Sequence, residues 1–262
     1  MSRFVKLILI AALAGVLTAP LGGAASAEIT TYPVKDRKLT TNPLYETGRL
    51  PSTTCAEKPV KRNDRKKARA YFDAVIDCLG TTWEQHLTAA GLPYEKVKVR
   101  HMTRIPKKYC GLDVGKEDSQ ALYCSDNGTI IVQMGREWLS EPDDLWLFDM
   151  AAYAYAYHVQ ELVGIGPAFQ KLPYGKKAEL QEQIRRTNLQ ADCLAAAFVK
   201  SVWPLEGRTT KDWDHLVDLL DSVGEKESYG KPATIRHWVR RGFSTADPGS
   251  CNTWSVSHTE VA

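Results

Sequence analysis

The sequence predicts an α+β fold that is mainly helical, with two long central helices, a small antiparallel sheet and disulfide bonds. Two long segments, 140–163 and 176–202, contain no Gly or Pro beyond their first turn, which favours helices. Asn127-Gly128 stands between two short apolar runs, and both residues tolerate the positive φ of a hairpin turn. Six cysteines follow an N-terminal export signal, and an even number in an oxidising compartment indicates disulfides.

The N-terminus is typical of a secretory signal peptide at residues 1–27. Basic residues precede an apolar run from Leu7 to Leu17, and Ala25-Ser26-Ala27 provides a small-x-small site for cleavage after Ala27. The run is shorter than the ~20 residues that span a bilayer, and we find no later candidate for a transmembrane segment. We therefore expect a secreted, extracellular protein.

The rest of the chain is predicted to form an extended leader at residues 28–62 and a single domain at residues 63–262. The leader is rich in Thr, Pro and charged residues and has no sustained apolar period, so we expect it to be poorly packed. The basic run from Lys58 to Arg69 is interpreted as a solvated helix start. A net charge of +3 is too small to argue for nucleic-acid binding, and no motif supports that function.

The first half of the domain is predicted to contain one helix and the sheet. Residues 63–90 carry apolar side chains at helical spacing, with Asn63 as the cap. Residues 97–101 alternate apolar and polar side chains, as a half-buried strand does. The hairpin is expected to pair two further strands, 121–124 and 129–133.

The second half is predicted to be helical. Ser140 caps the helix at 140–163, which is apolar nearly all round and should therefore be central and buried. A loop at 164–175 leads to the helix at 176–202, where Asn188 is the one polar residue of the inward stripe. Two shorter helices, 213–223 and 233–241, precede a tail that carries the last cysteine.

The two long helices carry a family resemblance. Tyr157-His158-Val-Gln160, Leu189-Gln-Ala-Asp-Cys193 and Trp238-Val-Arg-Arg-Gly-Phe243 resemble the "putative neutral zinc metallopeptidase" family, in the same order and at the same spacing. The resemblance covers about Arg104 to Thr253 and implies a zincin-like fold. The stretch before Arg104 resembles the N-terminal extension of actinobacterial members.

The resemblance also implies where a zinc site would be. In that family the first helix reads His-Glu-x-x-His-His-Val-Gln, in which two histidines bind zinc and the glutamate activates the metal-bound water. A third ligand, a glutamate, directly precedes Leu-Gln-Ala-Asp-Cys on the second helix. These four roles correspond to the following residues of this chain: Tyr153, Ala154, Tyr157 and Asn188.

All four of these positions have lost the chemistry of the family. A tyrosine phenol is neutral at physiological pH and a poor zinc donor, and Asn188 offers only a neutral carbonyl. Ala154 can neither accept nor donate a proton. We therefore expect no zinc or other cofactor, and a protein that is not an enzyme. His158 matches the extra histidine after the family motif and is expected to be hydrogen-bonded in the interior.

Two uses of the former site are compatible with the sequence. Tyr153 and Tyr157 are expected to face Asn188 and to fill the space of zinc and its water. Alternatively, Tyr153, Tyr157, His158 and Asn188 line a groove that binds peptide or glycan without cutting it. The resemblance further implies three disulfides, Cys55–Cys78, Cys110–Cys124 and Cys193–Cys251, each worth about 2–4 kcal/mol.

The leading functional hypothesis is a secreted, catalytically inactive homologue of a zinc metallopeptidase that acts as a binding or structural protein. Its partner would be a peptide or protein in the extracellular space. One alternative is a hydrolase that works through another site, with Asp192 or His158 as candidates, although the chain has no Gly-x-Ser-x-Gly elbow. Another is a regulator of an active paralogue.

Overall fold

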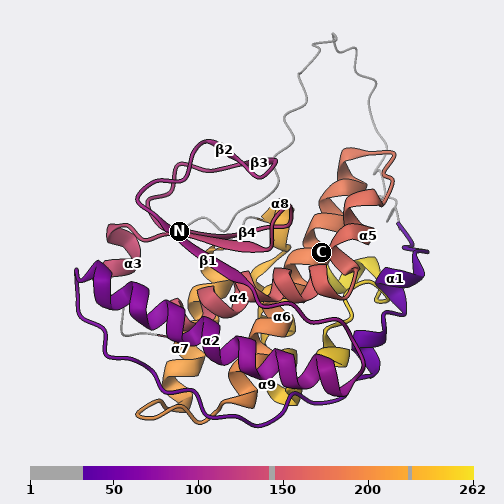
Figure 1. Ribbon diagram of the computed structural model, residues 1–262. Coiled ribbons are helices and arrows are strands. Elements are labelled where there is room, and N and C mark those ends of the chain that lie inside the picture. The colour runs from indigo at the N-terminus through magenta and orange to yellow at the C-terminus, as the bar shows by residue number, and fades with distance from the viewer. Residues whose placement is uncertain (1–31, 142–144, 224–225) are drawn as a thin grey trace.

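The computed structural model describes residues 32–141, 145–223 and 226–262. The predicted signal peptide therefore lies outside the described residues. Figure 1 shows helices gathered around a small sheet. The elements are α1 (Arg37–Thr40), η1 (Pro43–Glu46), α2 (Arg65–Ala89), β1 (Lys98–Met102), β2 (Lys108–Tyr109), β3 (Leu112–Asp113), β4 (Gln120–Cys124), β5 (Thr129–Gln133), α3 (Arg136–Ser140), α4 (Trp146–Leu162), α5 (Ile165–Lys171), α6 (Lys177–Ser201), α7 (Thr210–Val223), α8 (Lys226–Tyr229), α9 (Pro232–Thr245), η2 (Pro248–Cys251) and η3 (His258–Glu260).

Helix α4 lies at the centre of the molecule. Its residues 146–156 are all buried, and α4 packs against α2, α5, α6 and β4 (Figure 1). A helix that is apolar on every side is stable only when protein surrounds it. The predicted central helix is therefore confirmed, as are the second long helix, now α6, and the α+β class. No described helix is long and apolar enough to cross a membrane.

The sheet has the order β1-β5-β4 and is mixed rather than antiparallel. Strands β4 and β5 pair antiparallel around Gly128, whose φ is +66°, as the hairpin signal predicts. The expectation of an antiparallel sheet is wrong because β1 pairs with the other edge of β5 in parallel. The chain passes through the β2–β3 hairpin between β1 and β4, and it thereby crosses to the opposite edge of the sheet. Every residue of β5 is buried, as expected for a strand with partners on both sides.

The segment 32–62 is packed, so the expectation of a poorly packed leader is wrong for these residues. Leu39 and Leu44 are fully buried in the main core. The side-chain amide of Asn42 donates to the carbonyl of Val163 at 3.0 Å, at the end of α4. Isolated leucines separated by Thr and Pro give no periodic signal, and their burial depends on helices distant in sequence.

Several details of the helices differ from the predictions. Asn63 has a φ of +60°, and the cap of α2 is Asp64, which accepts from the backbone N–H of Lys67 at 3.1 Å. Ser140 is the last residue of α3 and donates to the carbonyl of Glu137, so it does not cap α4. The predicted loop after α4 contains the helix α5. Pro167 is compatible with this helix because it lies in the first turn, where its missing N–H needs no partner.

Helix α9 crosses α6 at a point where only glycine fits. A Cβ atom built at Gly242 would overlap the backbone carbonyl of Cys193 on α6. The same Cys193 forms a disulfide with Cys251 at the end of η2. The other disulfides join Cys55 to Cys78 and Cys110 to Cys124, so the three pairs are those that the family resemblance implies. The close packing at Gly242 and the disulfide thus join α9 and η2 to α6 at Cys193.

His158 joins α4 to the sheet. Its Nε2 lies 2.7 Å from the carbonyl oxygen of Glu95, which can only accept, so Nε2 carries the hydrogen. Its Nδ1 lies 3.1 Å from the hydroxyl of Tyr123 on β4 and accepts from it in the neutral ring. Burial lowers the pKa of His158, which favours this neutral form. The ring is therefore a buried connection between two elements.

The crossing of α6 and α9 predicts that Gly242→Ala destabilises the protein. We expect a loss of about 3 kcal/mol in the free energy of unfolding, because the added methyl group meets backbone that cannot move aside. The measurement is denaturant unfolding with the disulfides intact. Gly175→Ala is the matched control, since its nearest atom would be the flexible carboxylate of Glu179 at 3.7 Å. Equal effects of the two substitutions would contradict this packing.

The connection made by His158 predicts a pH dependence of stability. Because the folded-state pKa is lowered, the unfolded chain takes up the proton first as the pH falls below ~6.5. The stabilisation is therefore complete above that pH and is lost on acidification. Unfolding free energies measured between pH 7.5 and about 5 should fall less steeply in His158→Gln than in the wild type. His215→Gln, a change at an exposed position of α7, should keep the wild-type slope; an unchanged slope in His158→Gln would refute the assignment.

Candidate functional site

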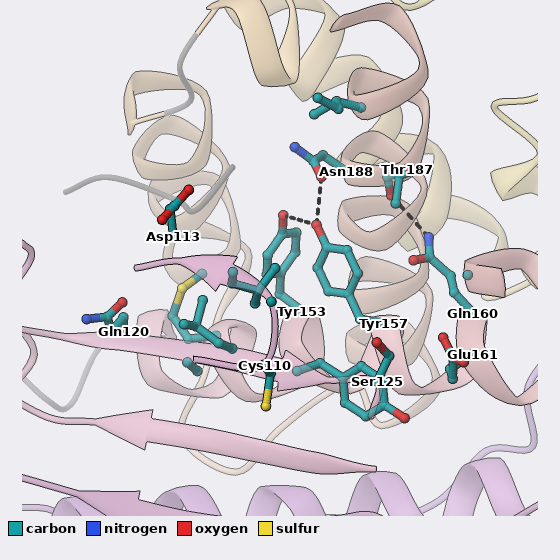
Figure 2. Close-up of a pocket in the computed structure, with 18 of the residues that line it drawn as sticks. Cys110, Asp113, Gln120, Ser125, Tyr153, Tyr157, Gln160, Glu161, Thr187 and Asn188 are labelled. Carbon is teal, nitrogen blue, oxygen red and sulfur yellow. Dashed lines mark hydrogen bonds between the residues drawn. The ribbon is translucent and has the colours of Figure 1, made fainter. Parts of the chain in front are cut away.

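Tyr153, Tyr157 and Asn188 meet between α4 and α6. The two tyrosines are one helical turn apart, with their rings edge to face at 5.2 Å and their hydroxyls 2.7 Å apart. The hydroxyl of Tyr157 donates to Asn188 Oδ1 at 2.7 Å, as the dashed lines in Figure 2 show. Tyr153 and Asn188 are 7% and 5% exposed, whereas Tyr157 is half-buried, so the contact is only partly buried.

The order of the hydrogen bonds follows from the number of hydrogens. Asn188 Nδ2 donates to the carbonyl of Ser228 at 2.9 Å, so its Oδ1 faces Tyr157 and can only accept. Tyr157 therefore uses its one hydroxyl hydrogen on Asn188, and Tyr153 donates to Tyr157. Tyr229, whose hydroxyl lies 2.9 Å from that of Tyr153, donates in turn to Tyr153. The four residues Tyr229, Tyr153, Tyr157 and Asn188 form one directed chain, named here the tyrosine chain.

Sequence reasoning missed Tyr229. It lies on α8, a helix of four residues, and it is fully buried. A helix this short has no periodic pattern, and a lone tyrosine between Lys226 and Pro232 gives no reason to place it beside α4. Only the tertiary packing of α8 against α6 brings Tyr229 into the chain.

Ala154 is separate from the other three positions of the family motif. It is 1% exposed and belongs to the main hydrophobic core. Its methyl group does not line the pocket beside the tyrosine chain. Of the four positions that the resemblance assigns to the zinc site, the structure brings together Tyr153, Tyr157 and Asn188.

A pocket of about 320 Å³ lies beside the tyrosine chain. Its walls come from α4, α5 and α6 on one side and from β4 and the β2–β3 hairpin on the other (Figure 2). Tyr153, Tyr157 and Asn188 line it, whereas His158 does not. The tyrosine side chains thus occupy the space between the helices, and a cavity remains next to them.

Asp192 and His158, the candidates for a hydrolase site, are both buried away from this pocket. Asp192 is 2% exposed on α6, and His158 is 2% exposed with its ring between Glu95 and Tyr123. Neither residue lines the pocket. The pocket beside the tyrosine chain is therefore not a cavity in which either candidate could act on a substrate.

One cluster of potential metal ligands occurs among the described residues. It consists of Cys110, Cys124 and Asp126, whose ligand atoms lie within 4.8 Å of one another. The two cysteines are bonded to each other as a disulfide. A metal binds the thiolate form of cysteine, so this cluster lacks two of its three donors while the disulfide is intact.

Comparisons with known proteins agree with the resemblance found in the long helices. The family model described as "Putative neutral zinc metallopeptidase" matches residues 21–227. Two curated relatives, from Escherichia coli K12 and Escherichia coli O6:H1, are both described as "Uncharacterized protein YpfJ". Each is 24% identical over 231 residues, which cover 80% of this chain and 79% of the relative. No solved structure matches the chain. Because the family model covers well over half of the sequence, the protein belongs to the "putative neutral zinc metallopeptidase" family.

Proposed function

We propose that this protein is a secreted, catalytically inactive member of its family that acts as a binding or structural protein. The observation that supports this proposal is the tyrosine chain. Three of its four residues stand at the positions that the resemblance assigns to zinc ligands, and they are bonded to one another. A set of side chains that satisfies its own hydrogen bonds needs no metal to stabilise it.

The donor atoms of the site do not fit zinc. Zinc in proteins is bound by imidazole, thiolate or carboxylate groups, and a catalytic ion needs three of them. Here the donors are two neutral phenols and one amide oxygen, and that oxygen already accepts the hydrogen of Tyr157. Metal binding would require loss of a phenolic proton and disruption of the tyrosine chain. These donors therefore support no reaction step through a metal at this site.

The position of the family's general base carries no titratable group. A base must lie within hydrogen-bonding distance of the proton that it takes, and it must have a titratable group. The position that corresponds to the family's catalytic glutamate is Ala154, whose side chain is a methyl group buried in the core. Restoring the metal alone would therefore leave water activation without its proton acceptor.

Secretion is the second part of the proposal. The sequence of residues 1–27 is typical of a signal peptide. All six cysteines are paired in the structure, and such disulfides persist in oxidising compartments rather than in the cytosol. Both features favour a protein that leaves the cytoplasm before it folds.

The alternatives gain no specific support. A hydrolase centred on His158 would need a ring nitrogen available to substrate, but both nitrogens have protein partners. A role as regulator of an active paralogue stays a prediction from ancestry. A non-catalytic binding or structural role is the function that the site supports best.

Zinc titration in a calorimeter tests the loss of the metal site. We expect no saturable binding to the wild-type protein, because its donors are neutral and engaged with one another. The matched variant Tyr153→His/Ala154→Glu/Tyr157→His/Asn188→Glu restores three ligands and the base, and we expect it to bind about one zinc per chain. Folding of both proteins is checked by near-UV circular dichroism. Tight one-to-one binding by the wild type would contradict the proposal.

The N-terminus of the exported protein tests secretion. Expression of the full chain in a bacterial host should give a product in the extracytoplasmic fraction that begins at Glu28, because signal peptidase cuts after the small-x-small site. Intact mass and N-terminal sequencing measure this directly. Ala27→Leu should slow processing and leave the longer form. A product that keeps residues 1–27 and stays in the cytosol would show that the segment is not a signal peptide.

A further inference from the structure

The pocket beside the tyrosine chain has an acidic wall. Its charged lining residues are Asp113, Asp126, Glu137 and Glu161, and no Lys or Arg of the described residues lines it. This bias stands out because the chain as a whole has a net charge of +3. A cavity lined by one sign of charge raises the local concentration of ligands of the opposite sign. The pocket therefore favours cations.

The rest of the wall is aromatic. The aromatic lining residues are Tyr123, Trp138, Trp146, Tyr153, Tyr157 and Phe169. The faces of these rings carry negative partial charge and attract ammonium and guanidinium groups, while the ring surface packs against apolar groups. The same wall thus suits a ligand with a cationic end and an apolar body.

Two buried glutamines in the pocket wall each have a side-chain oxygen that accepts no hydrogen bond from the described residues. Gln120 and Gln160 are 2% and 1% exposed, and both side chains are part of the pocket lining in Figure 2. The amide nitrogen of Gln160 donates to the carbonyl of Thr187 at 3.1 Å, and that of Gln120 lies 3.5 Å from the carbonyl of Glu117. These contacts fix the orientation of each amide. The Oε1 atom of each has no hydrogen-bond partner among the described residues. A buried acceptor left in this state is costly, so a hydrogen-bond donor supplied by a ligand would stabilise either oxygen.

We propose that this pocket binds a small organic cation, a primary ammonium or guanidinium group attached to an aromatic or short aliphatic body. The inference rests on the proposed non-catalytic binding function and names its class of ligand. The volume of about 320 Å³ is at the lower end of the range of about 300–1,000 Å³ for small-molecule sites. It accommodates one ring with a short amine chain, whereas a peptide would place only one side chain inside.

Glu161 is a lining acid whose charge acts on the aromatic wall. It lies on α4, and its carboxylate lies against Gly166 of α5. Burial raises the pKa of the pocket residue Tyr123, and the negative charge of Glu161 adds to this effect. Its charge therefore acts at the aromatic wall, where Asp113 lies on the other side of the pocket (Figure 2).

Three probes of similar size and different charge test the proposal. Isothermal titration calorimetry of the full mature chain in buffer with EDTA compares 2-phenylethylamine, 2-phenylethanol and 3-phenylpropionate. We expect the amine to bind about tenfold more tightly than the neutral alcohol, because the acidic and aromatic wall acts only on the cation. The carboxylate should not bind. Equal affinities for amine and alcohol, or no binding of the amine at millimolar concentration, would overturn the proposal.

Matched variants locate the binding. Glu161→Gln should weaken amine binding about fivefold and leave the affinity for the alcohol unchanged. Asp77→Asn removes one negative charge from α2 away from the pocket and should change neither affinity. Equal effects of the two variants on amine binding would show that the pocket is not the site.

Binding of a lysine-containing hexapeptide by a protein that does not bind the free amine would also overturn the proposal. Zinc content measured on protein purified without a chelator reports separately on the proposed loss of the metal site.

Discussion

The contact between α4 and α6 is the constraint on which the rest of the structure depends. Helix α4 is enclosed by α2, α5, α6 and β4, so any polar group on it must find its partner inside the protein. Tyr157 bonds to Asn188, and Gln160 bonds to the carbonyl of Thr187 and to Gln190, all of which lie on α6. Gln190 in turn donates to the carbonyl of Cys251, beside the disulfide that holds the tail. The helix pair is thereby joined to the C-terminal segment through one buried polar network.

The tyrosine chain is a consequence of this enclosure. A metal site between two buried helices requires charged or imidazole donors, and its loss leaves a polar space that cannot remain empty without cost. Phenol groups suit such a space because the ring fills volume while the hydroxyl both donates and accepts one hydrogen bond. Tyr229 completes the chain from α8, so the tyrosine chain extends beyond the positions of the family motif. An acidic and aromatic pocket lies next to the tyrosine chain.

The features that the sequence could predict are those that depend on residues close together in the chain. The hairpin at Asn127-Gly128 and the burial of α4 depend on residues close in sequence, and the structure confirms both. The mixed sheet, the packing of Leu39 and the place of Tyr229 depend on contacts between distant segments, for which a single sequence has no periodic signal. The meeting of Tyr153, Tyr157 and Asn188 was expected only because the resemblance relates them to one metal site. The pocket was not foreseen as acidic, since Asp113, Asp126, Glu137 and Glu161 come from four separate segments.

The zinc content of the protein as purified tests the central claim most directly. The protein is prepared from cells grown with added zinc and without any chelator, and metal is measured by elemental mass spectrometry against protein concentration. The tyrosine chain predicts far less than one zinc per chain, and no change in Tyr157→Phe or Asn188→Ala. One zinc per chain that is lost in either variant would show that these side chains still hold the metal, and would contradict the account.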